Sequence, residues 1–202
     1  ALLLSLRACG IGCGDEVVVP AFTFISTAST VCYAGAKPVF ADIDPSTFTL
    51  TAQTIESVLT KKTKAVIVVH LYGQVADMNP ILKLCKSKKI VVIEDVAQAI
   101  GAEYHGKKAG SLGKTGCFSF YPTKNLGGMG DGGMIITQDT KTEKCIRELR
   151  DHGQARKYQF TQLGYNSRLD EIQAAVLEIK FHHLDMWVNS RRKLAKLYHQ
   201  QL

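Results

Sequence analysis

Short apolar runs alternate with stretches of helical pattern along the chain, and this alternation restricts the fold more than any other feature of the sequence. Six runs predict strands, at residues 16–20, 38–42, 65–71, 90–95, 116–121 and 133–138. Helices are predicted around them, over residues 1–9, 26–34, 51–60, 77–87 and 140–150. Short strands that are apolar throughout and alternate with helices are typical of a mainly parallel sheet covered on both faces. We therefore predict an α/β fold, with ligands beyond the carboxyl ends of the strands.

Composition fits one globular domain. The 202 residues are 46% hydrophobic and 8% aromatic, and no stretch approaches the roughly 20 apolar residues that span a bilayer. No signal sequence opens the chain. Six cysteines are scattered without CxxC pairs or zinc-ligand spacing, so they are interpreted as small core residues in a reducing compartment. These features predict a cytoplasmic protein that does not bind to membranes.

The net charge of +7 comes from basic clusters at residues 83–89, 105–108 and 191–196, with acidic residues between them. No aromatic-interleaved basic strand or helix-turn-helix pattern accompanies them, so we expect no nucleic-acid partner. Solvated helix faces account for most of this charge, and a smaller part of it favours a phosphorylated ligand.

Both ends of the chain carry helical patterns. Residues 1–9 have no capping residue before them, and residues 191–202 are still helical in pattern where the sequence stops. We therefore expect a piece of a longer polypeptide, with one domain over residues 1–178 and a helical extension over residues 179–202.

A lysine and a carboxylate follow two of the predicted strands. Lys124 lies in FSFYPTKNLGGMGDGG, where an apolar run breaks into a glycine-rich loop, and Asp95 ends the run IVVIED. An amine and a carboxylate in these places suit pyridoxal phosphate, because the amine forms a Schiff base with the cofactor aldehyde and the carboxylate keeps the pyridine nitrogen protonated. Taken singly, both residues have simpler interpretations: Lys124 as a solvated loop residue and Asp95 as a turn cap. His70 is equally typical of a satisfied core histidine, and Gln98 of a surface loop.

Other motifs are rejected. Gly128, Gly130 and Gly133 match G-x-G-x-x-G, but they lead into a strand instead of opening a helix, so they are not a dinucleotide fingerprint. No phosphate-binding P-loop or G-x-S-x-G motif is present. His182 and His183 lack acidic or cysteine partners at ligand spacing, so no metal site is predicted.

Seven blocks of sequence stand in an order that resembles one known family. They are GDEVVVPAFTFISTAS, AGAKPVFADID, VVHLYGQVADM, VIEDVAQAIGA, GSLGKTGCFSFYPTKNLGGMGDGG, LRDHGQ and LGYNSRLDEIQAA. The chain is similar, from Leu2 to about Tyr198, to the DegT–StrS family of pyridoxal phosphate-dependent nucleotide-sugar aminotransferases. The resemblance implies the large domain of the type I aspartate aminotransferase fold, truncated at both ends.

The resemblance also implies a role for each matching residue. Lys124 resembles the Schiff-base lysine that also carries the proton between substrate and cofactor, and Asp95 the partner of the pyridine nitrogen. Phe24 matches an aromatic ring that stacks on the cofactor. Gln98 matches the residue beside the phenolic oxygen, and Ser119 matches a hydroxyl donor to the phosphate.

Three further residues are expected near the site. Asn166 resembles an asparagine that reaches the neighbouring subunit's phosphate, which implies a homodimer. His70 and Tyr121 are expected to line the substrate pocket without a catalytic step. Two parts of the family pattern lie outside the 202 residues: the Gly-Thr or Ser-Thr turn that cradles the phosphate, and the small carboxy-terminal domain. We therefore expect weaker cofactor binding by this chain than by a complete relative.

The implied activity is transfer of an amino group from an amino acid, glutamate by the resemblance, to a keto sugar carried on a nucleotide. Two alternatives stay open. One is a catalytically inactive, cofactor-binding regulator or scaffold. The other is a sugar dehydratase, but dehydratases of the family carry histidine where this chain has Lys124, which argues against it.

Overall fold

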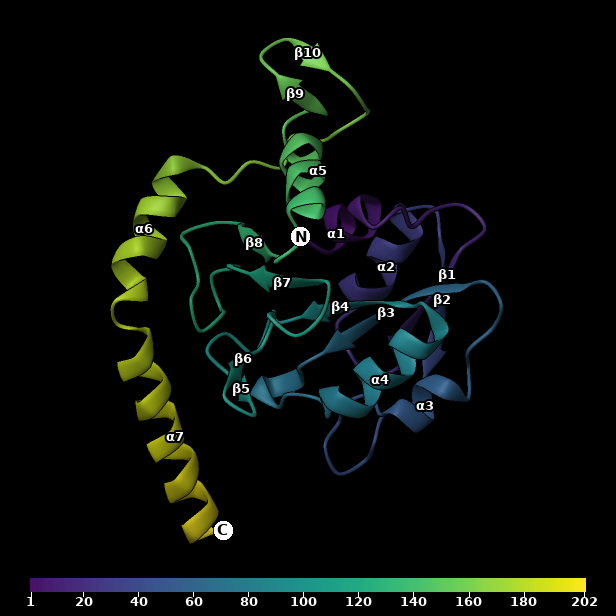
Figure 1. Ribbon diagram of the computed structural model, residues 1–202. Coiled ribbons are helices and arrows are strands. Elements are labelled where there is room, and N and C mark those ends of the chain that lie inside the picture. Colours follow the sequence, from purple (N-terminus) through teal and green to yellow (C-terminus); the bar gives the residue numbers. More distant parts are fainter.

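A six-stranded sheet forms the centre of the protein (Figure 1). The computed structural model describes all 202 residues. The strands lie in the order β2-β1-β3-β4-β7-β8, and every neighbouring pair is parallel except β7 with β8. Their bounds are Glu16–Pro20 (β1), Lys37–Ala41 (β2), Thr63–Val69 (β3), Val91–Asp95 (β4), Thr115–Ser119 (β7) and Gly133–Ile136 (β8). The predicted mainly parallel sheet is confirmed.

Helices cover both faces of this sheet (Figure 1). One layer holds α1 and α2, and the opposite layer holds α3 and α4. The helices of the chain are Leu2–Ala8 (α1), Ser26–Tyr33 (α2), Ala52–Glu56 (α3), Met78–Lys88 (α4), Thr140–Arg150 (α5), Glu171–Phe181 (α6) and Leu184–Gln201 (α7), with a short 3-10 turn at Leu71–Gly73 (η1). No helix is long and apolar enough to cross a membrane.

The central strands supply side chains to two cores. In β1, Val17 and Val19 pack with Leu6 of α1, whereas Val18 packs on the other face with Ile81 of α4. All three valines are fully buried. Successive side chains of a strand point to opposite faces, so a strand covered on both sides needs an unbroken apolar run. This is why the sequence pattern located these strands correctly.

A third core joins the sheet to the last two helices. Phe118 and Phe120, at the end of β7, pack with Leu126 of the following loop and with Leu177 and Leu184 of α6 and α7. The helix α6 starts at Glu171, so the expected border between residues 178 and 179 lies inside it. The division into a domain and an extension stays a prediction.

Some local elements differ from the prediction. The helix expected over 51–60 is only Ala52–Glu56, and it begins with a capping box between Thr51 and Thr54. Asp77 precedes α4 as expected, but its side chain accepts a hydrogen bond from Tyr104 instead of capping the helix. Two short hairpins were not predicted, because strands of two or three residues carry no periodic pattern; they are Glu103–Tyr104 with Lys107–Lys108 (β5, β6) and Gln154–Arg156 with Gln159–Phe160 (β9, β10).

Gly116 lets a loop cross the face of the sheet at β7. A Cβ atom at this position would lie 2.3 Å from the carbonyl oxygen of Gly110. We expect Gly116→Ala to lower the free energy of unfolding by about 1–3 kcal/mol, the usual range for overpacking, in urea denaturation. Gly12→Ala is the matched control, because its Cβ would meet only an ordinary contact at 3.7 Å. Equal stability of the two variants would contradict this interpretation.

Candidate active site

Asp95 is a buried carboxylate at the carboxyl end of β4. Its Oδ1 accepts a hydrogen bond from the Ala97 N–H at 3.1 Å, and its Oδ2 accepts one from the Thr27 hydroxyl of α2 at 3.2 Å. Burial raises the pKa of Asp95, and these two hydrogen bonds and the charge of Lys124 reduce the rise. A buried carboxyl with few donors is suited to binding a cationic group, because the cation supplies the missing stabilisation.

Lys124 follows β7 on a tight loop. Its N–H donates to the Tyr121 carbonyl at 2.8 Å, with Pro122 at the second position of this turn, where proline is favoured. Buried Leu126 anchors the loop in the third core. The charge of Lys124 acts on the pKa of Asp95, so the two groups lie within electrostatic reach. That this amine and this carboxylate serve one site stays a prediction.

Helix α6 holds the glycine-rich part of this loop. The Lys180 amine donates to the Gly127 carbonyl, and the Gln173 side-chain carbonyl accepts from the Met129 N–H at 2.7 Å. A Cβ at Gly127 would lie 2.4 Å from the Pro122 carbonyl, so the loop requires glycine there. These helix–loop contacts could not be predicted from local patterns, because the partners lie more than 40 residues apart. Thr27 was missed as well, although it stands in the block that holds Phe24.

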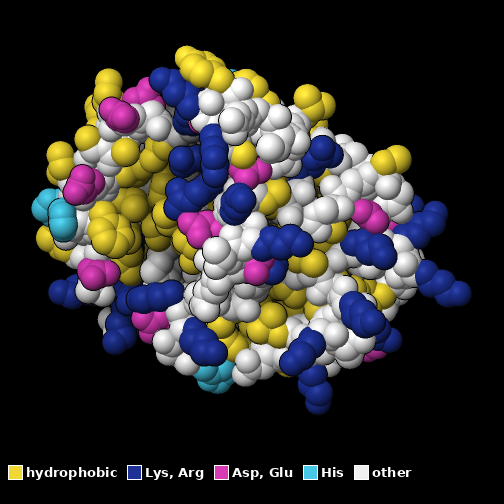
Figure 2. Space-filling view, turned by 45° about the horizontal axis from the view of Figure 1, so that its top comes forward, with side chains coloured by type: hydrophobic (Ala, Val, Ile, Leu, Met, Phe, Trp, Pro, Cys, Tyr) yellow, Lys and Arg dark blue, Asp and Glu magenta, His cyan; other side chains and the backbone are white.

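A cleft of about 620 Å³ opens beside Lys124. Its walls are the residues around η1 and residues 97–102 on one side, the Lys124 loop, and one face of α7. Gln98 lines the cleft, and its side-chain carbonyl accepts from the Tyr72 N–H at 2.9 Å. Figure 2 shows a hollow between the two last helices and the body of the protein, with hydrophobic side chains in its depth and Lys and Arg side chains nearby.

His70 does not fit its expected place in the substrate pocket. Its side chain is fully buried. The Nδ1 atom accepts from the Ala76 N–H at 3.3 Å, which leaves Nε2 to donate to Glu94 at 2.9 Å. With both ring nitrogens bonded inside the protein, His70 is a satisfied core histidine, the simpler of the two interpretations of the sequence.

The remaining predicted residues lie at the surface. Phe24 precedes α2 and is 70% exposed, so one face of its ring is open for a ligand. The Ser119 hydroxyl is half-buried and accepts from the Tyr121 N–H at 3.3 Å. Tyr121 is half exposed at the start of the Lys124 turn. Asn166 forms an isolated antiparallel β-bridge with Asp151, the residue that follows α5, and does not line the cleft. Their roles stay predictions.

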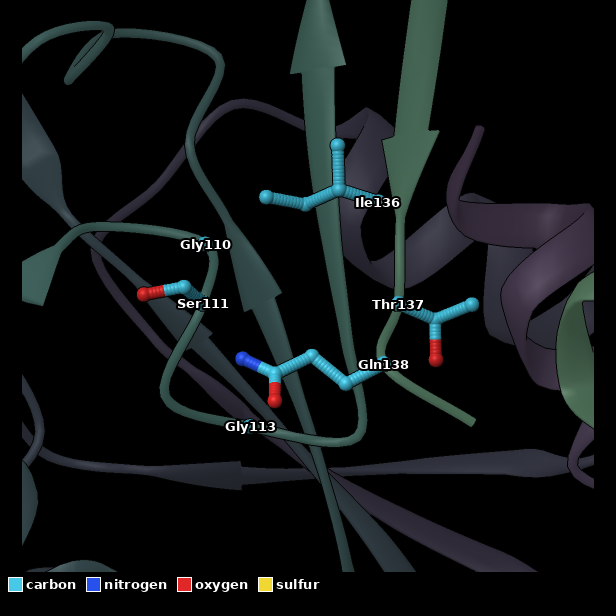
Figure 3. Close-up of a pocket in the computed structure, with 6 residues that line it drawn as sticks. All are labelled: Gly110, Ser111, Gly113, Ile136, Thr137 and Gln138. Carbon is cyan, nitrogen blue, oxygen red and sulfur yellow. The ribbon is translucent and has the colours of Figure 1, made fainter. Parts of the chain in front are cut away.

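A second, smaller cavity of about 130 Å³ lies between the loop before β7 and the end of β8. Figure 3 shows Gln138 reaching from the end of β8 toward this loop, with Ser111 on the loop itself. The lining contains no ionisable side chain. It therefore offers no amine or carboxylate, unlike the cleft at Lys124.

The fold is that of the type I aminotransferase class. S. venezuelae DesV, solved in complex with a ketimine intermediate, superimposes with a TM-score of 0.94 at 44% identity, over 98% of this chain and 53% of that one. The chain belongs to the DegT/DnrJ/EryC1/StrS aminotransferase family, whose profile it matches over residues 1–202.

Two relatives show the range of names in this family. A protein of Geobacillus stearothermophilus named "Pleiotropic regulatory protein" is 56% identical over 198 residues, 98% of this chain and 53% of the relative. The UDP-N-acetyl-3-dehydro-alpha-D-glucosamine 3-aminotransferase of Acidithiobacillus ferrooxidans is 52% identical over 202 residues, all of this chain and 55% of the relative. The chain thus spans about half the length of the curated relatives it matches.

The raised pKa of Asp95 predicts a pH-dependent stability. A carboxyl whose pKa is raised by folding stabilises the protein below its unfolded pKa of about 4, and that contribution is lost as the pH rises through the folded pKa. We expect Asp95→Asn to raise the melting temperature of the cofactor-free protein at pH 7 and to have little effect near pH 4. Asp170→Asn, at the exposed N-cap of α6, is the control without this pattern. If the melting temperatures of Asp95→Asn and the wild type differed by the same amount at every pH, a raised pKa of Asp95 would be contradicted.

Proposed function

We propose that the protein is a pyridoxal phosphate-dependent aminotransferase that acts on a keto sugar linked to a nucleotide. The observation that carries the proposal is a buried carboxylate, Asp95, within electrostatic reach of a loop amine, Lys124, beside a cleft of about 620 Å³. The residues fit the cofactor, because the pyridine nitrogen is the cationic group that the poorly solvated Asp95 lacks. The names of the sugar aminotransferases that resemble the chain support the substrate class.

In this proposal each residue has a physical task. Asp95 would pair with the ring nitrogen of pyridoxal phosphate and favour its protonated form, and Lys124 would hold the aldehyde end and move a proton to and from the α-carbon of the amino donor. Phe24 would cover one face of the ring, Gln98 would hold the phenolic oxygen, and the Ser119 hydroxyl would donate to the phosphate. When bound, pyridoxal phosphate supplies an electron-accepting ring that makes this proton acidic.

The donor is an amino acid, with glutamate and its product 2-oxoglutarate as the proposed pair. The subunit is proposed to act as a homodimer in which Asn166 reaches the partner's phosphate. The cytoplasm is the proposed compartment, in keeping with six cysteines that form no disulfide in the fold.

Removal of the amine tests the assignment of Lys124. In the full gene product we expect Lys124→Ala to reduce amino-group transfer by about 10³-fold or more, because covalent attachment and proton transfer are both lost. The visible absorption of the bound cofactor should also shift. Lys107→Ala, an exposed lysine on β6, should leave both readouts unchanged. Transfer at the wild-type rate by Lys124→Ala would refute the assignment.

Mixed subunits test the proposed dimer. Lys124→Ala and Asn166→Ala each damage every site of their own homodimer, but a mixed dimer keeps one site with its lysine and the partner's asparagine intact. We expect a mixture of the two purified variants to recover more activity than either alone once the subunits exchange. A mixture no more active than the sum of its parts would show that Asn166 does not act across a subunit interface.

A regulatory role is the second candidate, favoured by the 56% identical relative named "Pleiotropic regulatory protein". The two candidates differ in their response to substrates. An aminotransferase loses the visible absorption of its cofactor when glutamate is added and regains it with a keto sugar nucleotide. A regulator that only binds the cofactor shows neither change.

A further inference from the structure

One face of α7 forms a wall of the cleft at Lys124. Its residues Val188, Arg191, Arg192 and Ala195 all line the cleft, and their spacing of three and four residues places them on the same side of the helix. Leu184, one turn earlier, is buried in the third core and fixes the start of the helix. The packing of α7 therefore places both arginines at the cleft.

Neither arginine has an acidic partner. Arg191 and Arg192 form no ion pair within 4.0 Å, although six ion pairs occur elsewhere. Glu103, whose pKa is lowered mainly by the hydrogen bond and charge of Lys108 and less by Arg192, is already bonded to Lys108 at 2.6 Å. The 15 lining residues include no Asp or Glu. The lining of the cleft thus combines three cations, Lys124 and the two arginines, with no acidic side chain.

The opposite wall is largely apolar. Ala97, Ala99, Ile100 and Ala102 line it, with the Gln98 amide among them. Apolar walls focus the field of nearby charges and raise the local concentration of counter-ions. Guanidinium groups bind carboxylate and phosphate oxygens in pairs, with hydrogen bonds stronger than neutral ones.

We infer that Arg191 and Arg192 bind an anionic group of a substrate whose reacting end lies at Lys124. The inference rests on the proposed function and adds a binding subsite to it. Two substrates carry such a group: the amino donor, through its carboxylates, and the nucleotide sugar, through its diphosphate. The ligand chemistry is the same, namely oxygen pairs with negative charge, and separate half-reactions distinguish the sources.

The test uses Arg191→Gln and Arg192→Gln in the full gene product loaded with pyridoxal phosphate. One arm titrates L-glutamate and follows the loss of visible cofactor absorption. The other measures binding of UDP, GDP and dTDP by calorimetry, with and without cofactor. Lys193→Gln removes a positive charge from the same helix outside the cleft and serves as the matched control.

For each arginine variant we expect the ligand concentration at half-saturation to rise about tenfold or more in one of the two arms. For Lys193→Gln it should stay within about twofold of wild type. Arg192→Lys should recover part of the affinity, because it restores the charge without the paired donors. A glutamate effect assigns the subsite to the donor, and a nucleotide effect assigns it to the acceptor.

Unchanged affinity in both arms would overturn the inference. That result is distinguishable from failure of the proposed function, because wild-type protein would still form its visible cofactor absorption and lose it with glutamate. An equal loss of affinity in Lys193→Gln would likewise overturn it, since the effect would then be general electrostatics and not a subsite.

Discussion

The active-site edge of the sheet depends on one buried carboxylate, Glu94. Its two oxygens accept four N–H hydrogen bonds: from His70 at the end of β3, and from Gly110, Leu112 and Gly113 in the loop before β7, at 2.6–2.9 Å. Burial alone would raise the pKa of Glu94, but the hydrogen bonds from His70, Gly113 and Gly110 outweigh it, so the pKa is lowered. This charge ties the segments before and after β4 together and so sets where β7, and the lysine loop after it, can lie.

Glu94 and Asp95 are neighbours in sequence with opposite environments. Their side chains point to opposite faces of β4, because successive residues of a strand alternate. The first carboxylate is fully satisfied by the protein, whereas the second has two donors and a raised pKa. Glu94 thus holds the surrounding backbone in place, whereas Asp95 can still bind a cation. Diverging environments of this kind often mark the functional member of a pair.

The fold was predictable where burial is two-sided. The residues of β1 and β3 that are buried on both faces, 17–19 and 65–69, are all apolar, so the run itself identifies the element. It was predictable too that Asp95 ends one parallel strand, β4, and that Lys124 follows its neighbour, β7, at the same edge of the sheet. The contacts of Thr27, Gln173 and Lys180 were not, because they join segments far apart in sequence through single polar side chains. The role of His70 depended on Glu94, whose importance appears only when the loop before β7 is seen to fold back onto it.

The loop that carries Lys124 is positioned by one element of the fold and held in place by another. Its position follows from β7, but its glycine-rich half is held by Lys180 and Gln173 of α6, which also contributes Leu177 to the third core. The same core anchors α7 through Leu184. Movement of α6 or α7 against the sheet would therefore shift the amine at 124 and the arginines of the cleft wall together. A single hydrophobic cluster thus keeps Lys124 and the two arginines in a constant relation, as the proposed site would require.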